Sequence, residues 1–522
     1  LYGPNDGKVF EGVLGRELSN PVPEWAEHQP PDGSGRVPVH VGTDMDAPNP
    51  DSGEEYYHTN TQLFGTIDDH NRFAGADEMK APWNAPPDGA APTMDGFVTD
   101  YISFFTWEMG RQPSYDEYAQ IMQCYTPDQV PVLNGLAREF GVFDHWFCEV
   151  PSQTFMNRSF WTAATCTPLP TGGTVNTPVG HWVHDNTAET IFDRLESLGR
   201  TWKVYVEGDT GASLTGIIHW PRLHERFATN FVPFSEFEKD AAAGTLPDFS
   251  LIEPNLLVGH GDYHPAAGAA LVKGVHLDVD VPSSILSGEA FLQRIYDAYR
   301  GMRSPNGANV WNTALLIGWD EPGGTYDHVP PGPVPPPETS APAGQFGFRF
   351  DRSGYRVPAI MVSPWVESGS VYNAEHRHTS LLATMRKLWQ TGEPFTERDK
   401  NAAAFDYVFS RETPTDPDEW SVPRANPVPQ WQIDWEADDR TLSNLGKVAI
   451  PGLLATAKEK GWPIQPELED PNFHLTAQLA FHAQQLLFKK FWPQLGPQGE
   501  SLEQLQATVA EDLKKATQPE DA

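Results

Sequence analysis

Segments with helical and strand patterns alternate through the middle of this 522-residue sequence. Asn186, with Glu189 three residues later, is expected to cap the first helix, which Gly199 ends. The expected helices are 187–198, 289–300 and 379–389, and the expected strands are 202–206, 248–253, 313–319 and 356–363. This alternation predicts an α/β fold, in which a central sheet is covered by helices on both faces.

The apolar run 313–319 ends abruptly in two carboxylates, Asp320 and Glu321. In open α/β sheets, ligands bind at the carboxyl ends of the strands, and the pair Gly323-Gly324 lets the next stretch of backbone turn tightly there. Two adjacent carboxylates are suited to a hard cation. The alternative is an exposed acidic turn, which the glycine pair and the following Asp327-His328 make less attractive.

Two other segments supply reactive groups that are suited to phosphoester hydrolysis. Thr154, in 151–158, supplies a hydroxyl nucleophile, and His264, in 262–265, supplies a proton donor or a phosphate ligand. A phosphoester repels nucleophiles, so a catalyst has to neutralise its oxygens and deprotonate the attacking hydroxyl. The alternatives are a helix-cap hydroxyl for Thr154 and a structural role for His264.

Three of these segments resemble motifs of the phosphoesterase family that contains non-specific phospholipases C and certain acid phosphatases. The segment 154–158 is similar to its Thr-x-Pro-Asn-Arg motif, 320–329 to its Asp-Glu-x-x-Gly-x-x-Asp-His-Val motif and 354–358 to its Gly-x-Arg-Val-Pro motif. The resemblance extends from about Met94 to Trp389. It implies an alkaline-phosphatase-like fold and metal-assisted attack by Thr154 on phosphorus.

The sequence departs from this family pattern in two places. Met156 replaces the proline of the first motif, which removes no reactive group. Such proteins usually begin with an apolar strand that leads to Glu-Asn-Arg-Ser-Phe-Asp, whose first two residues help to hold the metal, and this hexapeptide is absent. We therefore expect that an amino-terminal strand and two metal ligands lie outside the numbering. The alternatives are a cleaved fragment that stays bound and a chain without full activity.

Supporting roles are expected for several other polar residues. Thr154 itself joins Asp320 and Glu321 as an expected metal ligand, and Asp327 and His328 are expected to orient the carboxylates from behind. Hard oxygen ligands favour Mg²⁺, Ca²⁺ or Mn²⁺, and Zn²⁺ is an alternative if histidines are also ligands. The candidate substrate-binding residues are Asn157, Arg158, His219 and His58. The alternative role of Arg158 is to brace the loop by pairing with a carboxylate. The alternative for His219 and His58 is that they are buried core histidines whose hydrogen bonds are satisfied.

Two rival functions remain open on the sequence alone. One is a non-catalytic scaffold or binding protein that keeps the fold but lacks the amino-terminal ligands. The other is a sulfate-ester hydrolase, although such enzymes usually use a modified Cys or Ser in a different motif. The substrate, whether phospholipid, phosphodiester or phosphomonoester, is not fixed by the sequence.

Composition restricts the partners and the organisation of the chain. A net charge of −35 repels polyanions, so nucleic acid is not an expected partner, and no stretch is apolar enough to span a bilayer. Residues 1–395 are expected to form the catalytic domain, with a loop-rich insertion near 21–92. Residues 396–522 are expected to form a mainly helical extension packed on it.

Three cysteines allow one disulfide at most. The sequence indicates neither an oligomeric state nor a compartment, which leaves secreted, periplasmic and cytoplasmic locations open.

Overall fold

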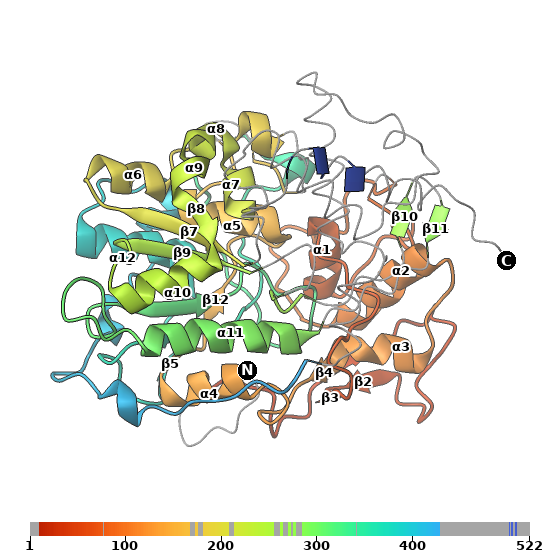
Figure 1. The fold of residues 1–522 in the computed structure, drawn as a ribbon. Helices are drawn as coiled ribbons and strands as arrows, with labels where there is room; N and C mark the ends of the chain where they lie inside the picture. Colours follow the sequence, from red (N-terminus) through yellow and green to blue (C-terminus); the bar gives the residue numbers. More distant parts are fainter. Residues whose placement is uncertain are drawn as a thin grey trace.

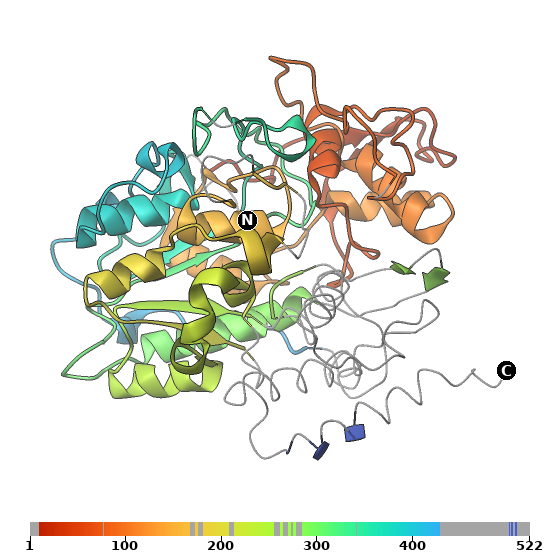
Figure 2. The same cartoon turned by 90° about the horizontal axis from the view of Figure 1, so that it is seen from above.

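A computed structural model shows the fold of residues 10–428 (Figures 1 and 2). Within that range it does not describe residues 77, 168–172, 176–180, 208–212, 255–260, 265–269, 273–274, 278–283 and 341, and beyond it describes only 501, 503–504 and 507–508. Most of the expected helical extension, 396–522, lies beyond residue 428 and outside the described residues. Among the described residues, no helix is long and apolar enough to cross a membrane.

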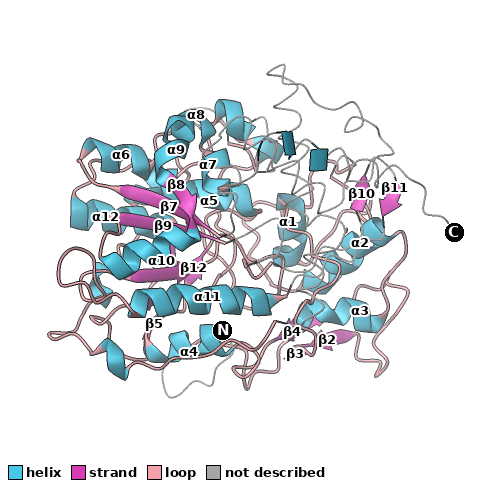
Figure 3. Cartoon of the chain, in the orientation of Figure 1, coloured by secondary structure: helices cyan, strands magenta, loops and turns pink. Residues whose placement is uncertain are grey.

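The described chain forms a mixture of helices and mostly short strands (Figure 3). The α-helices are α1 Tyr56–Phe64, α2 Phe97–Met109, α3 Tyr115–Ala119, α4 Pro131–Glu139, α5 Thr154–Ala163, α6 Ile191–Ser197, α7 Leu214–Ile218, α8 Trp220–Leu223, α9 Phe227–Asn230, α10 Phe234–Ala243, α11 Ile285–Arg300, α12 Thr379–Trp389 and α13 Glu397–Lys400. The strands are β1 Ser19–Pro21, β2 Arg36–Pro38, β3 His40–Val41, β4 Gln123–Cys124, β5 Gly141–Phe143, β6 Trp146–Phe147, β7 Trp202–Val206, β8 Phe231–Pro233, β9 Phe249–Glu253, β10 Ala270–Val272, β11 Val275–Leu277, β12 Leu315–Gly318, β13 Ala359–Val362, β14 Ser370–Tyr372 and β15 His376–Arg377.

Two groups of strands build the centre of the molecule. In the first, β8, β7 and β9 pair in parallel in that order. In the second, the order is β12-β13-β5-β14, with β13 antiparallel to both of its neighbours and β14 parallel to β5. The carboxyl ends of β9 and β12 lie at the same edge, because Glu253, the last residue of β9, and Asp320, just beyond β12, both bind Arg158.

Helices cover both faces of the first group of strands. Successive β7 residues point to opposite faces, as the two-residue period of a strand requires. Tyr205 packs with Phe237 of α10 and Phe291 of α11, whereas Val204 packs with Leu195 of α6 and with α12. In the view from above, α11 (green) and α12 (cyan) lie on opposite sides of the strands (Figure 2). The predicted α/β class, with helices on both faces, is therefore confirmed.

Most predicted elements are present, but two helix starts are wrong. The helix expected from Glu289 begins at Ile285, as α11. The strand 202–206 and the helix 379–389 match β7 and α12. The helix expected from Thr187 instead begins at Ile191, where Thr190 and Asp193 form the capping box. Asn186 does not cap it, because the Asn186 side chain is fully buried and donates to the carbonyl of Ile218. A tertiary contact thus outweighs the local capping pattern.

The segment 21–92 is rich in loops but also contains a helix that the residue pattern did not indicate. All nine residues of α1 are buried, and the helix packs against α2. This buried helix places the preceding segment, which includes Asp51 and Glu54, next to the acidic loop after β12, since Ser52 Oγ donates to the carbonyl of Gly323 at 2.6 Å. Cys124, Cys148 and Cys166 are all free.

Candidate active site

Thr154 is the first residue of α5 and is almost completely buried. The unpaired amides at the start of a helix give that end a partial positive charge, which favours a negative group beside the hydroxyl. Thr154 lines one cavity together with the acidic residues Asp320 and Glu321 and with His264. The structure therefore brings together the predicted nucleophile, the predicted carboxylates and the predicted proton donor.

Arg158, one turn further along α5, ties the nucleophile helix to the two strand ends. Its Nε donates to Asp320 at 2.8 Å and its Nη1 to Glu253 at 2.9 Å. These carboxylates keep the pKa of Arg158 above its usual value, although burial opposes that shift. Arg158 therefore braces the site through carboxylates, one of the two roles considered for it. A direct contact with substrate stays a prediction.

The acidic loop after β12 turns sharply at its two glycines. Gly323 and Gly324 both have positive φ, 62° and 63°. A Cβ at Gly324 would also lie 2.5 Å from Ser52 Oγ, so no larger residue fits there. The amide of Gly323 donates to the Glu321 carboxylate at 2.6 Å. The turn thus holds Glu321 in place while the chain passes Asp51 and Glu54.

Glu321 lies in an environment with an excess of negative charge. Burial, followed by the carboxylates of Glu54 and Asp320, raises the pKa of Glu321 well above its usual value. Glu54 Oε1 is buried and accepts no hydrogen bond within the described residues, although His264 Nε2 lies 3.4 Å away. Buried carboxylates facing one another are stabilised by a cation. The oxygen donors of Asp320, Glu321 and Glu54 are of the kind that a hard divalent ion prefers, whereas the described residues whose ligand atoms lie close enough to share one ion are Asp51, Glu54 and His264.

His264 lies among carboxylates that the sequence reading did not assign to it. Its Nε2 is 3.4 Å from Glu54 and 3.7 Å from Asp51, and the three side chains are close enough together to share one ion. Burial lowers the pKa of His264, but Asp51, Glu54 and Asp262 outweigh that effect and raise it well above its usual value. A protonated imidazole at the cavity is a proton donor.

His378, just before α12, contacts the acidic loop after β12. It precedes α12 without capping it, is fully buried and stacks on Trp161 at 4.4 Å. His378 Nε2 donates to the carbonyl of Asp320 at 2.6 Å, while Trp146 donates to His378 Nδ1 at 3.1 Å. Both ring nitrogens are thereby committed, which fixes the tautomer and holds the backbone of Asp320. Because its partners are distant in sequence, no local signal could reveal this role.

Asn157 shapes the turn before the nucleophile. The side chain is fully buried, and its Oδ1 accepts the amides of Glu149 and Val150 at 2.9 and 3.0 Å. Its Nδ2 donates to the carbonyl of Ser152 at 2.7 Å. These bonds fix the loop that leads into α5, and the expected contact of Asn157 with a phosphoryl oxygen stays a prediction.

His219 and His58 are buried and hydrogen-bonded. His219 Nε2 lies 2.7 Å from Thr162 Oγ1, and burial lowers the pKa of His219 to about 3. His58 Nδ1 lies 2.9 Å from the buried Asp100 carboxylate, which raises the pKa of His58 although burial opposes it. These contacts match the alternative of satisfied core histidines, and substrate binding by either residue stays a prediction.

Two of the motif segments, 320–329 and 354–358, brace each other. Both carboxylate oxygens of Asp327 accept hydrogen bonds from Arg356, at 2.9 and 2.8 Å. His328 is next to Asp327, and burial lowers the pKa of its imidazole. The bidentate pair ties the segment 320–329 to the segment 354–358, and the expected orienting action on Asp320 and Glu321 stays a prediction.

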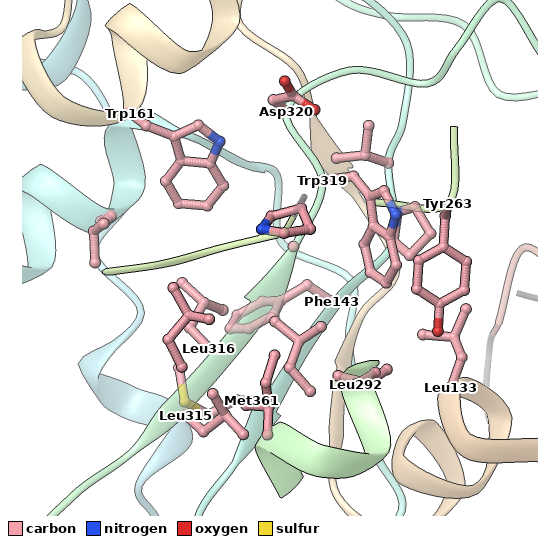
Figure 4. A pocket seen from close by; sticks show the side chains of 18 of the residues that line it. Leu133, Phe143, Trp161, Tyr263, Leu292, Leu315, Leu316, Trp319, Asp320 and Met361 are labelled. Carbon is pink, nitrogen blue, oxygen red and sulfur yellow. The ribbon is translucent and has the colours of Figure 1, made fainter. Parts of the chain in front are cut away.

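The site opens into a cavity of about 1150 Å³. Figure 4 shows Asp320 at one end of this cavity, near Trp161, and the apolar side chains of Leu315, Leu316 and Leu292 gathered away from it. The cavity thus has a polar end at Asp320 and an apolar part lined by leucines.

The sequence is similar to those of several known proteins. The model of the Phosphoesterase family matches residues 32–392. Non-specific phospholipase C6 from Arabidopsis thaliana is 30% identical over 421 residues, which are 78% of this chain and 68% of that protein. Phospholipase C A from Mycobacterium tuberculosis is 29% identical over 291 residues, 51% of each chain.

Among solved structures, a protein in the alkaline phosphatase superfamily from Vibrio parahaemolyticus is matched over 77% of this chain and 99% of that chain, with 13% identity and a TM-score of 0.28. The family model covers well over half of the sequence, including Thr154, Asp320 and Arg356. The chain belongs to the Phosphoesterase family.

Proposed function

We propose that the protein is a metal-dependent phosphoester hydrolase of the phospholipase C type, with Thr154 as its nucleophile. Membership of the family makes it a phosphoric ester hydrolase. The observation that carries the finer proposal is the single cavity lined by Thr154, Asp320, Glu321 and His264. A hydroxyl, a carboxylate pair and an imidazole in one cavity are the parts that phosphoryl transfer requires.

Asp320, Glu321 and Thr154 would hold a divalent cation, with Glu54 close to the same position. When bound, the cation supplies positive charge for the phosphoryl oxygens and lowers the pKa of the hydroxyl beside it. Support comes from the raised pKa of Glu321 among buried carboxylates. The predicted cofactor is therefore a hard divalent ion, and Mg²⁺, Ca²⁺ and Mn²⁺ fit the oxygen donors better than Zn²⁺ does.

The reaction proceeds in two displacements at phosphorus. Thr154 first loses its hydroxyl proton to solvent. Its oxygen then forms a bond to phosphorus as the bond to the leaving alcohol breaks, and protonated His264 gives its proton to the departing oxygen. Water then attacks phosphothreonine, the Thr154–phosphorus bond breaks, and neutral His264 takes the proton of the water. The helix N-terminus at Thr154 stabilises the negative oxygens throughout.

The substrate class follows from the relatives. The curated relatives are named as phospholipases C, so we infer that this enzyme hydrolyses the phosphodiester of a phospholipid on the glycerol side. Phosphatidylcholine, p-nitrophenyl phosphorylcholine and p-nitrophenyl phosphate, each with and without chelator, test this inference. We expect the two diesters to be hydrolysed faster than the monoester, and chelator to abolish turnover until divalent ion is restored.

Protein metal content gives an independent readout of the cation site. Asp320→Asn combined with Glu321→Gln should deplete the divalent ion found by elemental analysis, whereas Asp248→Asn, an exposed carboxylate of the cavity lining, should leave it unchanged. Equal metal content in both variants would refute the ligand assignment. A faster monoester reaction would instead indicate an acid phosphatase.

A further inference from the structure

The loop that carries His264 is anchored by the residue before it. Tyr263 has a positive φ of 64°, a backbone conformation that bulky residues rarely adopt. Its hydroxyl donates to Glu289 Oε1 of α11 at 2.8 Å, and its ring packs edge-on against Trp319, with the ring centroids 5.3 Å apart (Figure 4). Such a conformation persists only where the surrounding contacts determine it. The contacts of Tyr263 therefore fix the backbone of this loop.

Glu289 is a buried carboxylate that joins two helices to Tyr263. Its side chain is fully buried, and its two oxygens accept the amides of Val132 and Leu133, in the first turn of α4, at 2.6 and 2.9 Å. The N-cap residue of α4, Val130, has no side-chain oxygen, so Glu289 satisfies two amides that the helix itself leaves without a partner. The acceptor of the Tyr263 hydroxyl is thus held in place by both α4 and α11.

Gly288 makes room for the ring of Tyr263. A Cβ at this position of α11 would lie 2.3 Å from the ring carbon Cδ2 of Tyr263. Glycine inside a helix is less favourable than alanine, so its presence here is explained by the close approach of the ring. The helix is therefore shaped to receive Tyr263 as well as to bind its hydroxyl.

The anchored backbone determines where the imidazole of His264 lies. The amide of His264 donates to Asp262 Oδ1 at 3.0 Å, which closes a tight turn around Tyr263. The Tyr263 hydroxyl points toward Leu133 and away from Asp320 (Figure 4), whereas His264 Nε2 lies 3.4 Å from Glu54. The two side chains share one peptide bond, so a shift of Tyr263 would move the imidazole.

We propose that Tyr263 and Glu289 are positioning residues, which hold His264 where it can reach the leaving oxygen. The inference rests on the proposed role of His264 as the proton donor. Neither Tyr263 nor Glu289 touches the reacting atoms in this role, because both act through the backbone of the loop. Loss of their hydrogen bond should therefore slow the protonation of the leaving group and spare the attack by Thr154. The expected signature is a selective loss on substrates whose leaving group needs a proton.

Tyr263→Phe tests the inference, because it keeps the ring and removes only the hydroxyl. We compare kcat/KM on dihexanoyl phosphatidylcholine, whose leaving group is an alcohol, and on p-nitrophenyl phosphorylcholine, whose leaving group departs without a proton. The variant should lose about tenfold or more on the first substrate and less than about twofold on the second. In a His264→Ala background the same substitution should cause no further loss, because it acts through the imidazole.

Tyr296→Phe is the matched control. Tyr296 also lies on α11 and is fully buried, and its hydroxyl donates to the carbonyl of Ser421 at 2.8 Å. This variant should lower the melting temperature but keep the wild-type ratio of kcat/KM between the two substrates. Gly288→Ala is a second test, since it removes no hydrogen-bonding group but displaces the ring of Tyr263. It should change the ratio in the same direction as Tyr263→Phe, and it decides the question if Tyr263→Phe fails to fold.

Two results would overturn the inference and leave the role of His264 in place. One is an unchanged ratio between the two substrates in folded Tyr263→Phe, and the other is a further loss when Tyr263→Phe is added to His264→Ala. A His264→Ala enzyme that itself loses equally on both substrates would instead refute the proton-donor role, and this inference with it.

Discussion

Arg158 illustrates how the chemistry of single residues depends on distant partners. The local motif predicts that an arginine follows the nucleophile by four positions, but its carboxylate partners Glu253 and Asp320 are 95 and 162 residues away in sequence. Motifs therefore predict which groups react, because those groups are close in sequence. The motifs do not predict which distant residues position the reacting groups, as the contacts of Asp51, Glu54 and His378 show. Such contacts arise only when the chain has folded.

Thr154→Ala should abolish turnover while the protein stays folded. Loss of the nucleophile removes the covalent route, which typically costs several orders of magnitude in kcat. Steady-state kinetics on the best substrate and thermal unfolding check this result. Thr229→Ala, at an exposed threonine of α9, is the control and should behave as wild type. A Thr154→Ala enzyme that keeps more than about a tenth of wild-type kcat would rule out the assignment.

His264→Ala separates a proton donor from a phosphate ligand. If His264 protonates the leaving oxygen, the variant should lose far more kcat/KM on esters of alkyl alcohols than on nitrophenyl esters, because nitrophenolate departs without a proton. The comparison needs both ester classes and a melting curve. Equal losses on both classes at unchanged stability would remove the general-acid role but leave the hydrolase in place.

His219 should make the folded state less stable in mild acid. Its folded pKa, about 3, is below the usual value of about 6.5 because of burial, so the unfolded chain binds the proton more tightly between those pH values. Unfolding free energy should therefore fall as pH drops through this window, by about 2 kcal/mol from His219 alone between pH 7.5 and 5. Denaturant titrations of wild type and His219→Gln measure it, and an unchanged pH slope in the variant would contradict the expectation.

At the scale of elements, alternation and glycine placement predict four strands of the two central groups and three of the thirteen α-helices among the described residues. The strands 202–206 and 248–253 and the helix 379–389 are recovered because their apolar periods and ends are local signals. The start of α6 and the existence of α1 are not, since burial rather than capping or amphipathic pattern decides them. The pairing of β9 and β12 with their neighbours also has no local signature.

Only glycine fits at position 354, where the segment 354–358 packs closely against the loop before α5. A Cβ there would lie 2.3 Å from Cys148 Sγ and 2.7 Å from the carbonyl of Val150, so the segment 354–358 could not approach the loop before α5. Gly354→Ala should lower the free energy of unfolding by about 2 kcal/mol through overpacking. Gly332→Ala is the matched control, because its Cβ would meet no atom closer than 3.8 Å. Equal stability of the two variants by chemical denaturation would contradict this account.

For the whole molecule, net charge and family motifs agree with the structure on the kind of enzyme. A charge of −35 does not by itself prevent phosphoester binding, because the divalent ion proposed at Asp320 and Glu321 would offset the excess of carboxylates at the cavity. The overall composition predicts that polyanions such as nucleic acid do not bind to the protein. The local geometry, which only the folded chain has, decides what it binds.

The stereochemistry at phosphorus tests the two-displacement mechanism most directly. A single diastereomer of a phosphorothioate diester substrate is hydrolysed in ¹⁸O-labelled water, and the configuration of the product is determined. Attack by Thr154 followed by attack of water inverts phosphorus twice, so the account predicts overall retention. Overall inversion would show that water attacks the substrate directly, and it would contradict a phosphothreonine intermediate.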